Sequence, residues 1–103
     1  MERIWIIVTT VDDLSRAEHL ANGAVQAKLA ACAQIDSPIQ SRFHWQGKLE
    51  TVTEHRVTFK AGEEKKAGLM DWLRGQHPYE TPQILAFQAE PGDPAYSKWV
   101  NEE

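Results

Sequence analysis

The chain opens on an uninterrupted apolar run and then changes to a helical period. Residues 4–10 are rich in β-branched side chains, which predicts a strand buried on both faces. Helix-start side chains follow at 12–15, and Ser15 with Glu18 also has the spacing of a capping box. We expect a helix that ends near Ala31. Its narrow apolar stripe consists of Ala17, Leu20, Ala21, Ala24, Val25 and Leu29.

A long hairpin is expected next. Between 33 and 45 the apolar side chains alternate with polar ones, which predicts a strand, and Pro38 interrupts it at an edge, bulge or bend. Residues 46–48 (Gln-Gly-Lys) read as the turn. The returning strand divides its side chains between two faces. One face carries His55, Val57 and Phe59, and the other carries Glu54, Arg56, Thr58 and Lys60.

The last third of the chain repeats the helix-then-strand order. Gly62 ends the hairpin, a helix follows, and Gly75 and Pro78 stop it. Residues 84–89 predict the last strand, and 95–100 a short terminal helix. The order β-α-β-β-α-β predicts a single α+β domain over 1–103, a ferredoxin-like sandwich with a short C-terminal helix. One face of its sheet would lack helical cover, which favours self-association.

Composition narrows the function classes. The chain has 103 residues and a net charge of -4 without a basic stripe, so we expect no nucleic-acid partner. Cys32 is the only cysteine, which excludes an intrachain disulfide and a cysteine-rich metal site. The first apolar run is too short for a signal peptide or a membrane span, and we expect a cytoplasmic protein without a membrane partner.

Three blocks of sequence resemble the CutA divalent-cation-tolerance family. They are Leu-Ala-Ala-Cys at 29–32, Ser41 followed by Trp-Gln-Gly-Lys at 45–48, and His-Pro-Tyr-Glu-Thr-Pro at 77–82. The resemblance implies a homotrimer joined through long hairpins, an architecture related to the PII signalling proteins, and tolerance of copper and other divalent cations. We expect no enzyme activity, because no acid/base or nucleophile pair is evident in the sequence. Two family glutamates are replaced here by Gln46 and Gln83, which removes carboxylate ligands.

His77 and Glu54 are the first candidates for binding Cu(II) or another divalent cation, and Cys32 is the third. An imidazole suits copper, and Glu54 matches a recurring acidic position of the family strand. Each residue also has a plain structural alternative. His77 can cap a helix C-terminus, Glu54 can be a solvated strand residue, and Cys32 can be a small core residue.

The resemblance also groups four residues into a cleft between subunits. No periodicity in the sequence places these residues together. The cleft would suit a small organic or anionic ligand, and a PII-like regulatory trimer is therefore the alternative function. The sequence contains no catalytic set and no organic-cofactor motif. The cleft residues are Thr9, Trp45, Lys60 and Tyr79.

Overall fold

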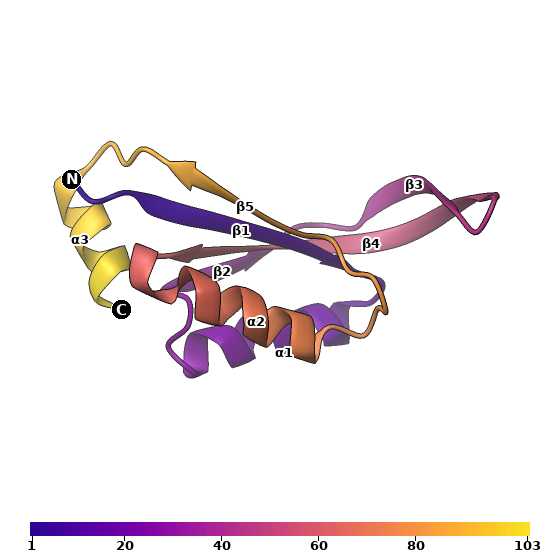
Figure 1. The fold of residues 1–103 in the computed structure, drawn as a ribbon, viewed down its shortest axis with the longest axis horizontal. Helices are drawn as coiled ribbons and strands as arrows, with labels where there is room; N and C mark the ends of the chain where they lie inside the picture. Colours follow the sequence, from indigo (N-terminus) through magenta and orange to yellow (C-terminus); the bar gives the residue numbers. More distant parts are fainter.

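The computed structural model describes all residues, 1–103, and shows a ferredoxin-like α+β fold (Figure 1). Neighbouring strands of the main sheet are antiparallel and follow the order β2-β4-β1-β5, which confirms the fold class expected from the sequence. The elements in chain order are β1 (Ile4–Val11), α1 (Leu14–Gln26), β2 (Cys32–Ile35), β3 (Ile39–Trp45), β4 (Lys48–Ala61), a 3-10 turn (Glu63–Lys65), α2 (Lys66–Gln76), β5 (Ile84–Ala89) and α3 (Pro94–Glu102).

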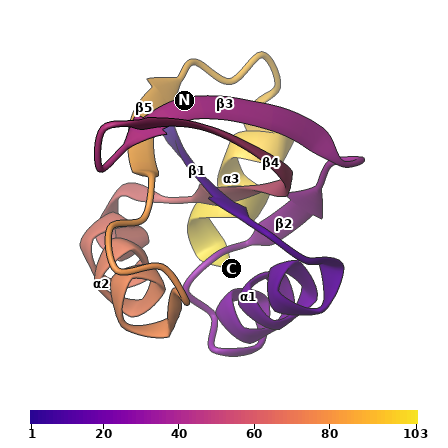
Figure 2. The same ribbon diagram turned by 90° about the vertical axis from the view of Figure 1, so that its right-hand side faces the viewer.

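The core lies between the sheet and the helices α1 and α2, which run beside each other on one face (Figures 1 and 2). On that face Ile7 of β1 stands in register between Phe59 of β4 and Ala86 of β5. Ile7 and Phe59 have no exposed surface. The helices contribute small or branched side chains at helical spacing, so they can sit close to the strands. These are Ala17, Leu20, Ala21, Ala24, Leu69 and Leu73.

Helix α1 starts as expected but ends early. Asp13 is the cap, because its Oδ1 accepts a hydrogen bond from the Arg16 N–H at 2.7 Å, and the alternative capping box at Ser15 is not used. The expectation of an end near Ala31 is wrong. Lys28 adopts a positive φ of 60°, a left-handed conformation that closes the helix just after Gln26.

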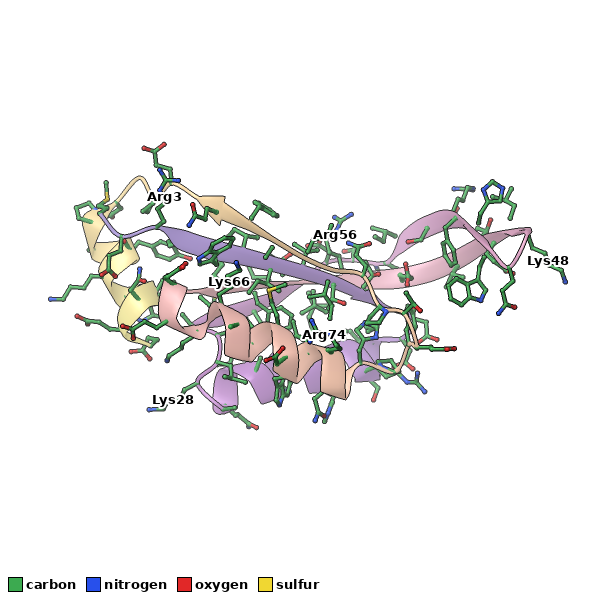
Figure 3. The ribbon with its side chains drawn as sticks, in the orientation of Figure 1. Arg3, Lys28, Lys48, Arg56, Lys66 and Arg74 are labelled. Carbon is green, nitrogen blue, oxygen red and sulfur yellow. The ribbon has the colours of Figure 1, made fainter.

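The strand expected at 33–45 is divided in two. Residues 36–38 separate β2 from β3, and Pro38 lies in this break, as its chemistry predicted. Strand β4 is long enough to pair with both, from Cys32↔Lys60 to Trp45↔Lys48. The β3–β4 half extends beyond the body as an arm, with Lys48 at its tip (Figure 3), and the molecule measures 46 × 24 × 23 Å. Positive φ angles at Gln46 and Gly47 form the turn.

The second face of the sheet is largely uncovered. Helix α3 covers one end only, where Val100 packs against Ile4. Further along, Leu85 is 57% exposed and Phe87 is 53% exposed. Ile6 and Val8 of β1, in register with these two β5 residues, are half-buried. We call these four residues the open apolar face. Within one chain, strand β1 is therefore not buried on both faces along its whole length as expected, because Ile6 and Val8 remain half-buried.

Candidate functional site

A buried carboxylate lies where the arm leaves the body. Glu54 pairs with Ile39 at the start of the arm, and the next residue, His55, pairs with Val11 at the end of β1. Glu54 is only 5% exposed, so the solvated-residue alternative is wrong. Its Oε2 accepts a hydrogen bond of 2.6 Å from the Tyr79 hydroxyl. The fold thus joins the arm to the segment that follows α2.

His77 holds that following segment in place. It is the C-cap of α2 in extended conformation, and its own N–H donates to the Leu73 carbonyl at 2.9 Å. The ring is buried, with 8% of the residue exposed. Nε2 lies 2.9 Å from the Thr10 carbonyl, and Nδ1 accepts from the Tyr79 N–H at 3.1 Å. Because a carbonyl only accepts, the ring is the neutral tautomer with its proton on Nε2.

Burial sets the protonation of both rings. It lowers the pKa of His77 below 6.5, although the Thr10 carbonyl, Glu54 and Asp12 favour the charged form. Burial also raises the pKa of Tyr79 well above its usual value of 10, and the hydrogen bond to Glu54 raises it further. Tyr79 is therefore a neutral phenol that donates to Glu54. The two rings meet edge-on, with centroids 4.8 Å apart.

One oxygen of Glu54 remains available. Tyr79 accounts for Oε2, and Oε1 has no hydrogen-bond partner within the chain. Every fully enclosed side-chain nitrogen or oxygen has a partner, so Oε1 is reachable from outside. The other charged groups that act on the Tyr79 ring are Asp12 and Arg16, which pair with each other at 3.7 Å. The arrangement therefore offers an external hydrogen-bond donor or cation one free, negatively charged acceptor.

The same geometry tests the metal prediction. A metal needs the lone pair of a neutral imidazole nitrogen, and in His77 the only such nitrogen already accepts from Tyr79. No three His, Cys, Asp or Glu side chains converge anywhere in the chain. Within one chain, His77 and Glu54 do not fit a transition-metal site. His77 would have to give up a main-chain hydrogen bond to ligate one.

Cys32, the third metal candidate, is not near this pair. It lies in register with Lys60, across the uncovered face, and is half-buried with a free thiol. Lys60 is in turn in register with Ile6, and Ile6 with Phe87, so that Cys32, Lys60, Ile6 and Phe87 form one row across the uncovered face. The structure therefore brings Glu54 and His77 together through Tyr79 and leaves Cys32 apart.

The four predicted cleft residues are dispersed within one chain. Thr9 is fully buried on the helix side of the sheet, and its hydroxyl donates to the Gln83 carbonyl at 2.7 Å. Lys60 belongs to the opposite face, since its strand neighbour Phe59 points into the core. Trp45 is at the arm tip and 43% exposed. Of the four, Tyr79 alone forms a hydrogen bond with the Glu54 side chain.

Two residues of the site were not predicted to belong to it. Thr10 supplies the carbonyl that orients His77, and a main-chain role has no sequence signal. Asp12 was expected only as a possible helix cap, yet its charge acts on both rings of the site. Its position directly after a buried strand was the one available signal.

The fold and site define a class: a small ferredoxin-like protein with a projecting hairpin arm and an acidic site at its base. The family model described as CutA1 divalent ion tolerance protein matches residues 5–103. The chain therefore belongs to the CutA1 divalent ion tolerance family, a family of cation-tolerance proteins and not of enzymes.

Individual relatives agree with this assignment. The divalent-cation tolerance protein CutA of Pectobacterium atrosepticum is 34% identical over 96 residues, which cover 93% of this chain and 87% of that protein. The solved structure of CutA from Synechococcus elongatus is 38% identical, with a TM-score of 0.91 over 97% of this chain and 88% of that one. A CutA structure from Archaeoglobus fulgidus, described as periplasmic, is 37% identical with a TM-score of 0.90, over 96% of both chains.

Proposed function

We propose that this protein acts in divalent-cation tolerance as a homotrimer whose arms pair with neighbouring copies. The open apolar face supports this proposal most directly. Leu85 and Phe87 are more than half exposed in a domain this small, and a face of this kind is typical of an interface. The arm also presents Phe43, Trp45 and Leu49 to solvent. Copies that cover both surfaces would create grooves at the bases of the arms, where Glu54 lies.

Carboxylate oxygens are the groups through which we expect a divalent cation to be held. Glu54 keeps a free oxygen and Asp12 is nearby, whereas His77 is engaged by the main chain. Cys32, which is in register with Lys60 and so lies far along β4 from Glu54, offers a separate soft ligand for copper. Ligands from several copies would be needed to complete either set, since one chain supplies too few.

Titration with Cu(II) tests the cation proposal. We expect the parent protein to bind Cu(II) with micromolar or tighter affinity, and Glu54→Gln to weaken binding by roughly tenfold because a charged ligand is lost. Cys32→Ser tests whether the Cys32 thiol is a ligand for copper. Glu50→Gln is the matched control, since Glu50 is on the same strand and makes no side-chain hydrogen bond or ion pair in the chain. Unchanged isotherms in both Glu54→Gln and Cys32→Ser would reject the ligand assignment.

A PII-like regulatory trimer that binds a small organic ligand is the second candidate. The enclosed Glu54 with one free oxygen favours this second candidate, because the site can accept a hydrogen bond but lacks the ligand arrangement of a metal site. A relative points the same way: the CutA structure from Synechococcus elongatus complexed with a Bis-Tris molecule is 36% identical, with a TM-score of 0.87 over 97% of this chain and 92% of that one.

A thermal-shift screen separates the two candidates. The midpoint of unfolding rises with the concentration of any ligand that binds the folded state only. At a hundred times its dissociation constant, a ligand adds about 2.7 kcal/mol of stability. We expect small amines or metabolites to raise the midpoint more than divalent metal salts if the second candidate is correct. A rise with metals alone would favour the first.

The compartment remains the cytoplasm in this proposal, as expected from the sequence. None of the helices combines the length and the hydrophobicity that a bilayer-spanning helix requires. The Archaeoglobus fulgidus relative is described as periplasmic, so fractionation of cells that express the tagged protein is the direct measurement.

A further inference from the structure

We propose that Glu54 and Tyr79 form a binding site for a primary ammonium group. This inference rests on the second proposed function, ligand binding between subunits, and it names the chemistry of the ligand. The starting observation is that Glu54 is 95% enclosed but its carboxylate accepts only one hydrogen bond, from the Tyr79 hydroxyl at 2.6 Å. An enclosed carboxylate is costly unless a cation or several donors compensate it.

No cation of the same chain compensates Glu54. It forms no ion pair, and the nearby Arg16 is held by Asp12 at 3.7 Å and by Asp13 at 3.4 Å. Arg56, on the same strand, pairs with Asp36 at 3.2 Å instead. The free oxygen of Glu54 thus faces the outside without a positive partner, in a neighbourhood to which Asp12 adds negative charge.

The acceptors at this site match an ammonium better than a bare divalent cation. An ammonium carries three N–H donors, and the site offers it the free Glu54 oxygen and the Tyr79 phenol oxygen as acceptors, while the charge of Asp12 acts on the same Tyr79 ring. The Tyr79 ring adds an aromatic face that attracts cations. Ca²⁺ would require six to eight oxygen ligands, and a transition metal would require the nitrogen lone pair that His77 has already used.

The ammonium has two possible sources, a free small amine or a lysine of a second copy. Lys60 is the candidate lysine, because the residue is half-buried and its side-chain ammonium has no hydrogen bond or ion pair within the chain. It shares strand β4 with Glu54 but lies six residues along it, roughly 20 Å away at ~3.3 Å per residue. Lys60 therefore cannot reach Glu54 of its own chain. The distance does not apply to Glu54 of a neighbouring copy.

The test compares two small probes that differ mainly in charge. Ethanolamine carries a primary ammonium, and ethylene glycol is its neutral counterpart of similar size. Amide resonances of the labelled parent protein are followed in two-dimensional spectra at fixed ionic strength. We expect ethanolamine to shift the signals of Glu54 and Tyr79 and ethylene glycol to leave them unchanged. Glu54→Gln, which preserves an acceptor for Tyr79, should weaken ethanolamine binding at least about tenfold. Glu50→Gln should bind like the parent.

A Lys60→Met variant distinguishes the two sources. If the site takes a free amine, the parent and Lys60→Met both bind ethanolamine. If the neighbouring Lys60 fills the site, the parent does not bind the probe and Lys60→Met does. The proposal is overturned if neither protein prefers ethanolamine to ethylene glycol, or if the preference survives in Glu54→Gln. The mass of the same samples in solution tests the trimer separately. A trimer that shows no ethanolamine binding in either protein would reject the ammonium site and leave the trimer proposal standing.

Discussion

A Phe87→Asp variant is expected to be a folded monomer under conditions where the parent chain has about three times its mass of 11.7 kDa. Phe87 is 53% exposed in one chain and lies in the row Cys32, Lys60, Ile6 on the uncovered face. In the proposed trimer this side chain is buried against a neighbour. A buried carboxylate without a partner costs several kcal/mol, which raises the half-dissociation concentration by roughly a thousandfold or more.

Light scattering after size-exclusion chromatography measures this mass directly. Leu14→Asp is the matched control, since Leu14 is 49% exposed at the start of α1, away from the uncovered face. It should remain trimeric. Because Phe87 is not part of the helix-side core, the circular dichroism of Phe87→Asp should keep its folded shape. A trimeric Phe87→Asp would show that copies do not meet through the open apolar face.

The sequence predicted the fold better than the assembly of the site, and particular residues show why. The spacing of apolar residues locates the helices and strands, because each of them must bury one side. The last strand, 84–89, was therefore placed with both ends correct. The end of α1 was misplaced because Leu29 and Ala30 still pack on the core after the helix has closed at Lys28. Burial alone cannot distinguish a helical turn from the loop that follows it.

The site depends on contacts that leave no periodic pattern in the sequence. In the alternating pattern of its strand, Glu54 occupies a polar position, as an exposed residue would. Only the hydrogen bond from the Tyr79 hydroxyl, 25 residues away, shows that it is enclosed. His77 was recognised through a family motif, and its hydrogen bonds to the Thr10 carbonyl and the Tyr79 N–H give it a structural role that the motif did not specify. Main-chain partners are set by the fold, so no single sequence reveals them.

Replacement of His77 by alanine is expected to destabilise the protein strongly at neutral pH and weakly at acidic pH. Alanine leaves the Thr10 carbonyl and the Tyr79 N–H without their ring partner. Each unsatisfied buried group costs about 1–3 kcal/mol, so we expect the free energy of unfolding at pH 7.5 to fall by about 2–4 kcal/mol. His77→Gln, which can donate and accept without titrating, should recover part of this loss.

The pH dependence follows from the direction of the His77 pKa shift. In the folded protein this pKa is below 6.5, so the unfolded chain binds the proton first as the pH falls. The stability that neutral His77 contributes is therefore complete above pH 6.5. It decreases below that pH until the folded-state pKa is reached. The difference in unfolding free energy between the parent and His77→Gln should consequently shrink from pH 7.5 to pH 5.

Urea unfolding at one protein concentration, repeated at each pH, gives this difference for the assembled protein. Groups that titrate equally in both proteins cancel, which leaves the contribution of His77. A difference that stays constant or grows on acidification would mean that the folded protein accommodates charged His77. Protonation would also place a hydrogen on Nδ1, where the Tyr79 N–H now donates, so the hydrogen bond that orients Tyr79 toward Glu54 would be lost with it.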